Sequence, residues 1–298
     1  MKTLYSILFT LVMFAWNTAN AQNYVFKVLA NRGESQVKTD GSWKPVKTGS
    51  TLNNGDELKV TEDAYIGLVH KTGKTYELKN AGLVDINELA SNLNSSSSSV
   101  ASKYADFVLN KMTASNGGNL TATGAVTRAV DGQTPLKVFT PSTVEVLNPE
   151  AKISWSNVED NATYVVTLKN MFDEVIMEEE TQKTAIDLNF ETPGLKDERL
   201  VIMNVSLKGS EDIKSGDIGI QRLAGEDAKP VMDELEGLKA ETTDGTAMSY
   251  LVLASFYENN NLLVDALTSY EKAIEISPDV EDFVIMRNNF IERNNLNK

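Results

Sequence analysis

Alternation of apolar and polar residues over two long stretches is the feature that most limits how this chain can fold. In residues 24–89 the alternation is clear at Leu58 and Val60, and again at Ile66, Leu68 and His70. Successive side chains of a strand point to opposite faces, so this period predicts strands with one buried and one wet face. Turns containing glycine separate the runs at the spacing of short strands. The first stretch therefore predicts a small β barrel or sandwich.

A second set of strands is predicted between residues 136 and 223. Trp155 alternates with Ile153, so we expect its ring in the core rather than on a ligand-binding surface. Six or seven short strands are typical of a β-sandwich. The predicted strands are 152–155, 163–168, 175–176, 185–188, 200–207 and 218–220.

From about residue 227 the apolar period becomes that of a helix. Met232, Leu235 and Leu238 are three residues apart, which predicts a helix over 227–240. A similar pattern predicts a helix over 281–293. The C-terminal part of the chain is therefore expected to be helical.

Composition excludes several kinds of chemistry. The chain has no cysteines, which excludes disulfides, thiolate catalysis and Cys-ligated zinc, and His70 is its single histidine. A net charge of -14 argues against a nucleic-acid partner, because phosphate binding requires clustered Lys and Arg. The motifs Gly-x-Ser-x-Gly, His-Glu-x-x-His and Gly-x-Gly-x-x-Gly and a Walker-type loop are absent, whereas the spacing of the 42 acidic residues does not exclude a pair of carboxylates for glycoside hydrolysis. We therefore expect a non-enzymatic protein without metal or cofactor, in which His70 is partly buried and hydrogen-bonded.

Residues 1–21 have the parts of a secretory signal peptide. Lys2 precedes an apolar run over 4–16, and Ala19-Asn20-Ala21 forms a small-x-small cleavage site. The run is shorter than the roughly 20 residues that a membrane-spanning helix needs. We expect cleavage between Ala21 and Gln22, and export of a chain that does not span a membrane.

Four short motifs in the first β stretch combine turn glycines with core aliphatic residues. They are Gly33-Glu34-Ser35-Gln36-Val37, Gly49-x-x-Leu52-x-x-Gly55-Asp56-x-Leu58, Ala64-Tyr65-Ile66-x-Leu68 and Gly73-Lys74-x-Tyr76-x-Leu78. Together they resemble the FecR domain, a small β module of bacterial periplasmic proteins. The resemblance implies a periplasmic location, leaves association with the outer membrane open, and supplies no catalytic residues. A signalling role like that of FecR regulators is less favoured, because no later transmembrane segment is predicted.

The second β stretch carries the frame Pro149-x-x-x-Ile153-x-Trp155, followed by Ala162-x-Tyr164. This frame resembles a fibronectin type III or related immunoglobulin-like sandwich. The resemblance implies that Trp155 packs against the opposite sheet, where antibody domains have a disulfide.

The C-terminal part contains the signature of a unit of about 34 residues that begins at Ala247. The eight signature residues are Tyr250, Leu253, Ala254, Tyr257, Ala266, Tyr270, Ala273 and Pro278. The pattern resembles a tetratricopeptide repeat (TPR), in which alanines allow two helices to cross closely. One repeat is fewer than the roughly three that usually give stability. Either flanking helices complete the unit, or a partner covers its exposed face. Leu251 and Ser255 would face the groove, so the clamp for a peptide carboxylate is not expected.

Residues 91–134 are predicted to connect the two β stretches. Serines fill 95–99, and Val100, Tyr104, Phe107, Val108 and Lys111 then lie at helical spacing. A short amphipathic helix is expected, followed by a flexible linker. Its apolar face could bind a partner or pack on the first β domain.

The predicted fold class is a multidomain, mainly β protein, with a small β barrel or sandwich, an immunoglobulin-like sandwich and a C-terminal α-helical TPR-like unit. The expected divisions are a signal peptide (1–21), a FecR-like domain (22–90), a linker (91–134), the sandwich (135–224) and the helical domain (226–298).

Two functional hypotheses follow from these modules. The first is a protein-interaction adaptor of a bacterial cell envelope, which binds envelope proteins mainly through its helical unit. The second is a binder of peptidoglycan or another glycan, with Trp43, Tyr65 and Tyr76 stacking on sugars.

Overall fold

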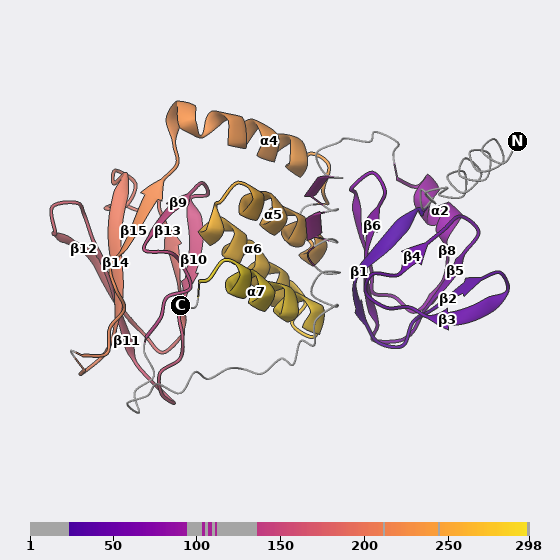
Figure 1. Cartoon of the computed structure of the whole chain (residues 1–298), viewed down its shortest axis with the longest axis horizontal. Coiled ribbons are helices and arrows are strands. Elements are labelled where there is room, and N and C mark those ends of the chain that lie inside the picture. The colour runs from indigo at the N-terminus through magenta and orange to yellow at the C-terminus, as the bar shows by residue number, and fades with distance from the viewer. Residues whose placement is uncertain are drawn as a thin grey trace, which may run out of the picture.

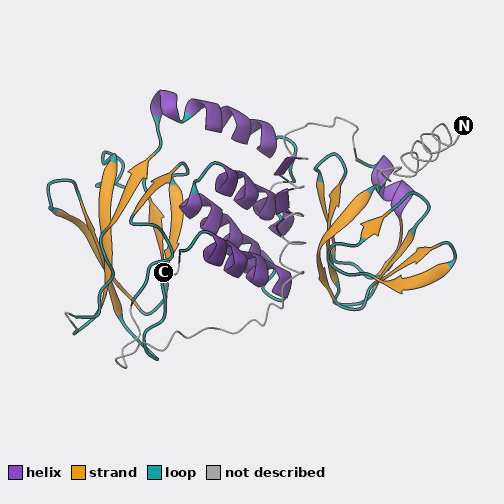
Figure 2. Ribbon diagram, in the orientation of Figure 1, coloured by secondary structure: helices purple, strands orange, loops and turns teal. Residues whose placement is uncertain are grey.

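A computed structural model describes residues 24–93, 103–104, 107–108, 111, 136–210, 212–243 and 245–296. This part of the chain is mainly β, with several sheets and a C-terminal helical region. The helices come last in the sequence, yet they lie between the two β-rich parts (Figure 1). Figure 2 shows the same order, with strands at both ends and helices in the centre. The predicted signal peptide, including Ala21 and Gln22, lies outside the described residues.

Two four-stranded sheets form the first β part, with the orders β4-β1-β6-β7 and β3-β2-β5-β8. They share a core in which Phe26, Leu58, Ile66 and Leu68 are fully buried. The strands are β1 (Phe26–Arg32), β2 (Gln36–Thr39), β3 (Ser42–Pro45), β4 (Thr51–Leu52), β5 (Glu57–Val60), β6 (Tyr65–His70), β7 (Thr75–Leu78) and β8 (Gly82–Asp85), and helix α2 (Ile86–Ser91) follows them.

Strand β6 is buried on both faces, whereas its alternation predicted one wet face. Ile66 and Leu68 point into the core of the first β part. Tyr65 and Val69 belong to a different apolar cluster, which is made mostly of helical residues. The wet-face prediction was wrong for this strand, because the helices cover its second face.

The second β part has a five-stranded sheet of order β12-β11-β14-β15-β9 and a two-stranded sheet of β10 and β13. As predicted, Trp155 is buried, and its ring meets Tyr164 edge-on at 5.5 Å between centroids. The strand β9 was not predicted, and it pairs in parallel with β15. The strands are β9 (Thr143–Val146), β10 (Glu150–Ser154), β11 (Tyr164–Lys169), β12 (Val175–Thr181), β13 (Ala185–Asn189), β14 (Leu200–Leu207) and β15 (Ile218–Arg222).

Four α-helices make up the C-terminal region, after a short 3-10 turn η1 (Gly225–Asp227). They are α4 (Lys229–Lys239), α5 (Ala247–Asn259), α6 (Leu263–Ile276) and α7 (Glu281–Arg293). The helices predicted over 227–240 and 281–293 correspond to α4 and α7. Helix α5 begins with a capping box, in which Thr246 and Ser249 exchange side-chain and backbone hydrogen bonds. In the described part of the chain, no helix combines the length and apolar character that crossing a bilayer requires.

Candidate interaction surfaces

The helical region touches the first β part closely at Gly67. A Cβ atom at this position would lie 2.3 Å from the Sδ atom of Met248, in the first turn of α5. The backbone N–H of Met248 donates to the Oε1 atom of Glu77 at 2.9 Å. Tyr65 meets Phe283 of α7 edge-on, with 5.7 Å between ring centroids. Glycine in the middle of a strand often marks such a close approach. The missing side chain of Gly67 leaves space for Met248 of α5.

A carboxylate of α7 also binds the first β part. Asp282 accepts a hydrogen bond from the backbone N–H of Asn31 at 2.9 Å and another from the Oγ1 atom of Thr48 at 2.8 Å. Arg32 and Asp279 form an ion pair at 2.9 Å nearby, but both side chains are exposed. Exposed pairs contribute little to stability, so we assign the polar part of this contact mainly to the hydrogen bonds of Asp282 and Glu77.

On the opposite side, the helical region binds the turn between β9 and β10 of the second β part. Asp265, in the first turn of α6, is only 1% exposed. Its carboxylate accepts hydrogen bonds from the backbone N–H groups of Leu147 at 3.0 Å and Asn148 at 2.8 Å, and from the Asn148 side chain at 2.6 Å. Tyr257 donates to the Oδ1 atom of Asn148 at 3.2 Å. These bonds fix the turn between β9 and β10 onto α5 and α6.

Burial sets the ionisation of this cluster. It raises the pKa of Asp265 to about 6, and the N–H donors around the carboxylate offset part of that rise. Burial also raises the pKa of Tyr257. The Asp265 carboxyl therefore loses its proton at a higher pH than an exposed aspartate does, even though it holds the turn between β9 and β10 on the helices.

Lys152 of β10 extends the same contact along α6. Its backbone N–H donates to the Oγ1 atom of Thr268 at 2.8 Å. Its Nζ atom lies 3.1 Å from Asp187 of β13 and 2.9 Å from Glu275 of α6. The ion pairs bridge strand and helix, so α6 lies along the edge of the two-stranded sheet.

The predicted linker helix appears in the structure at residues 103–104, 107–108 and 111. Val100 lies outside the described residues. The ring of Tyr104 meets Phe256 of α5 at 5.3 Å, and its hydroxyl donates to Glu234 of α4 at 2.7 Å. We expected this segment to bind a partner or the first β part; these contacts go to the helical region instead.

The groove face of the predicted repeat is therefore occupied by the chain itself. Ser255, which was expected to face an open groove, lines a small cavity together with Phe107 and Val108. Leu251 is fully buried. The apolar surface that motivated an external partner for a single repeat is covered from within the chain.

The eight signature residues divide by burial. Ala254, Tyr257, Ala266, Tyr270 and Ala273 are buried at the contact of α5 with α6 and its neighbours. Tyr250 and Leu253 are half-buried, and Pro278 is exposed beyond the end of α6.

The three aromatic residues proposed for glycan stacking do not form one platform. Tyr65 is only 4% exposed and packs on the helices, so its ring is closed to a sugar, and this assignment was wrong. Tyr76, on β7, is half-buried in the other sheet from Trp43. Trp43, on the edge strand β3, is 41% exposed, and the Nζ atom of Lys38 lies 5.8 Å from its ring centroid. Of the three aromatic residues, only Trp43 is exposed.

An open groove runs between the helices and the second β part, with a volume of about 470 Å³. Tyr250 and Leu253 line it from α5, and Lys239 and Lys272 line it from α4 and α6. Most of the other side chains that line the groove are polar, among them Ser249, Thr268 and Ser269. It has the character of a contact surface rather than a closed substrate pocket.

Among the described residues, no three His, Asp or Glu side chains gather as metal ligands would. His70, the single histidine, hydrogen-bonds through Nδ1 to the Oγ1 atom of Thr72 at 2.8 Å and is half-buried, as predicted. Its burial, with Lys71 and Lys74 nearby, lowers its pKa.

Sequence reasoning missed the residues that join the three parts. Asp265 is not one of the eight signature residues of the repeat, and Gly67 is the unspecified position of the motif Ala64-Tyr65-Ile66-x-Leu68. A signal existed for both: an acidic residue among apolar helix positions, and a glycine inside an aliphatic strand. Their partners lie more than a hundred positions away along the chain, as with Leu147 and Asp265.

Comparison with known proteins gives no family. No protein-family model matches the chain, and no characterised protein matches it in sequence. Among solved structures, a β-D-glucuronidase from Dictyoglomus thermophilum aligns with 68% of this chain at 11% identity and a TM-score of 0.19. The alignment spans about a third of that protein, 34% of its length. At that TM-score the likeness carries no argument about fold or activity.

Proposed function

We propose that this protein is a non-enzymatic adaptor, exported to the periplasm of a bacterial cell envelope, whose helical region holds two β domains at fixed positions. In this proposal the three parts are a FecR-like domain, an immunoglobulin-like sandwich and a TPR-like unit. The FecR and TPR likenesses rest on sequence motifs, and the sandwich also on the buried Trp155.

One observation carries the proposal: the helical region is bound on both sides by its own chain. Gly67 and Asp282 mark the contact on one side, and Asp265 marks it on the other. A helical unit used in this way spaces and orients its neighbours. The outward surfaces of the two β parts are then available for partners.

The test is in-cell cross-linking of the full-length protein, affinity purification from envelope fractions, and mass spectrometry. An adaptor is expected to yield one or a few dominant envelope proteins, and the same proteins should bind the purified chain. Recovery of sacculus fragments without a protein would contradict the adaptor proposal.

The exposed Trp43 favours a second candidate, a glycan or peptidoglycan binder. Aromatic faces open to solvent suit stacking on sugars. In sedimentation with purified sacculi, Trp43→Ala should then abolish binding. Leu83→Ala is the matched control, because Leu83 is an exposed apolar residue on β8 of the same sheet. Unchanged sedimentation of Trp43→Ala would remove this candidate.

A further inference from the structure

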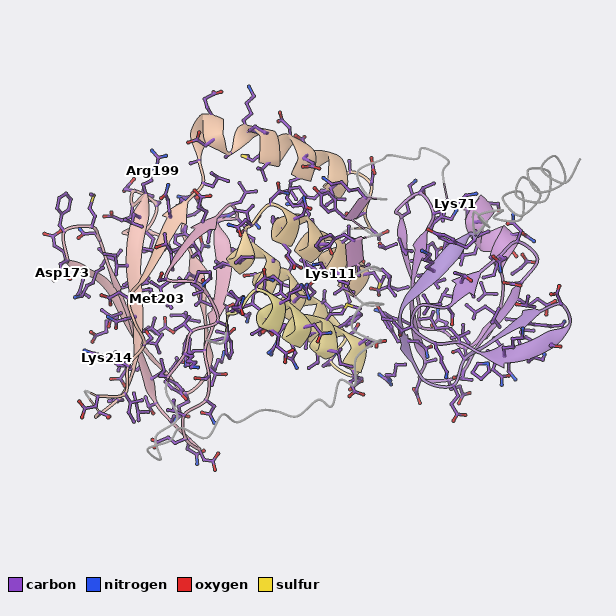
Figure 3. All side chains as sticks on the ribbon, viewed as in Figure 1. Lys71, Lys111, Asp173, Arg199, Met203 and Lys214 are labelled. Atoms are coloured by element: carbon purple, nitrogen blue, oxygen red, sulfur yellow. The ribbon has the colours of Figure 1, made fainter. Side chains whose placement is uncertain are left out.

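We propose that the hairpin tip between β11 and β12 is a docking point that inserts Met171 and Phe172 into an apolar pocket, rimmed by basic residues, on a partner protein. The inference rests on the proposed adaptor function and gives it a contact site. Met171 is 65% exposed and Phe172 is 76% exposed, and Val175 beside them is exposed as well. Asp173, in the same tip, lies at the outer end of the second β part, far from the helices (Figure 3).

The tip is held in one conformation by Asn170. The buried side chain of Asn170 accepts hydrogen bonds through Oδ1 from the backbone N–H groups of Phe172 at 2.9 Å and Glu174 at 3.1 Å. Its own backbone N–H donates to the carbonyl of Glu174 at 3.0 Å. Lys169 and Asp173 close the base with an ion pair at 2.7 Å. The two apolar side chains are thus displayed on an ordered turn, which lowers the entropy cost of binding.

Large apolar residues at this place have no role in folding that the structure shows. Hairpin turns favour Gly, Asn, Asp and Ser, and Met171 and Phe172 add nothing to the buried core of the second β part. Exposed clusters of this kind mark contact sites, and aromatic residues dominate the binding energy of protein interfaces.

Charge around the tip selects the kind of partner. At the tip, Asp173 pairs with Lys169, and the Glu174 carboxylate accepts a hydrogen bond from the Asn170 side chain at 2.8 Å. Glu178 and Glu179 lie further along the edge strand β12, opposite Thr167 and Val166, and Glu180 pairs with Lys208. Insertion into an anionic bilayer would bring these carboxylates against lipid phosphates. A protein pocket lined by apolar residues and rimmed by Lys or Arg satisfies both features, and this charge pairing also steers association.

The experiment places the photoreactive amino acid p-benzoylphenylalanine at position 172 of the full chain in the cells that make it. The matched control carries the same probe at position 232, because Met232 is an apolar residue 54% exposed on α4. We expect a protein adduct at 172 that is absent at 232. The adduct is identified by mass spectrometry, and the purified partner is titrated with the purified chain.

In that titration the double variant Met171→Ser/Phe172→Ser should bind at least tenfold more weakly, and Met232→Ser should bind as the unchanged chain does. Affinity should also fall as salt is raised. Thermal unfolding of each variant checks that the fold is intact.

Three outcomes would overturn the inference: no adduct at 172 beyond those at 232, equal affinity of the double variant, or Phe172-dependent sedimentation with vesicles of phosphatidylethanolamine and phosphatidylglycerol. An adaptor that binds partners equally well without the tip residues would fail this inference alone. Absence of any protein partner in the full-chain cross-linking would fail the adaptor proposal as well.

Discussion

At the residue scale, Asp265 is the clearest case of a side chain whose role comes from its partners. A buried carboxylate requires donors, and three N–H groups of Leu147 and Asn148 supply them. In Asp265→Asn, one of the two oxygens becomes an NH₂ group and faces a donor. We expect a loss of about 2 kcal/mol in the free energy of unfolding, the usual worth of hydrogen bonds to a charged group. Denaturant titration measures it.

The matched control for that substitution is Asp187→Asn at the same contact. Asp187 pairs with Lys152, but its side chain is 74% exposed. Exposed pairs contribute about 0–1 kcal/mol, so this variant should stay close to the unchanged protein. A larger loss for Asp187→Asn than for Asp265→Asn would contradict the role given to Asp265.

The pH dependence of stability should also report on Asp265. Burial raises its pKa from 3.8 to about 6, so between these values the folded protein binds a proton that the unfolded chain has lost. The contribution of this group to stability therefore falls as pH rises from about 4 to about 6. The stability advantage of the protein over Asp265→Asn should shrink across this window in thermal unfolding series. An advantage that grows with pH would show that the N–H donors outweigh burial.

At the scale of elements, the contact of β6 with α5 depends on a missing side chain. Gly67→Ala places a Cβ atom 2.3 Å from the sulfur of Met248, and the sulfur must move. We expect a loss of about 1–3 kcal/mol, as for other overpacked contacts. Gly219→Ala in β15 is the matched control, because its nearest neighbour would be an ordinary 3.6 Å away. Calorimetry of both variants measures the difference.

A double variant tests the origin of that loss. Met248→Ala removes the clashing sulfur, so Gly67→Ala should cost less in the Met248→Ala background than alone. If Gly67→Ala lowers the free energy of unfolding equally in both backgrounds, the loss does not arise from the contact with Met248.

Elements themselves were largely predictable, because their signals are local. Alternation identified β11 and β14, helical spacing identified α4 and α7, and the Ile153-x-Trp155 pattern placed Trp155 in the core. The strand β9 was missed although its four residues alternate, because so short a run lies between two turns.

Contacts between elements were not predictable in the same way. The second buried face of β6 depends on Met248, and the apolar tip at Phe172 carries no periodic signal. Such features join positions far apart in the sequence or lie in turns. The helical or strand period of apolar residues therefore cannot predict these contacts or the apolar tip.

At the scale of the whole molecule, the two β parts should keep one separation. The chain has no cysteines, so Lys44→Cys in β3 and Lys183→Cys beyond β12 give two unique labelling sites, both exposed. Pulsed electron spin resonance on the doubly spin-labelled protein should yield a single narrow distance distribution. Adding Gly67→Ala should broaden it, and Gly219→Ala should leave it unchanged. A broad distribution in the unmodified background would contradict the proposed role of the helices, which is to hold the two β parts at a fixed separation.

The helices α4 to α7 come last in the sequence but lie between the two β parts, and this has a consequence for the synthesis of the chain. A chain that emerges from the N-terminus presents both β parts before the segment that joins them. Until residues 247–293 are complete, Gly67 and the turn at Asn148 face solvent without their helix. A chain cut short in this region would lack the contacts that fix the two β parts relative to each other. The helices that are synthesised last therefore determine whether the two β parts take up one fixed arrangement.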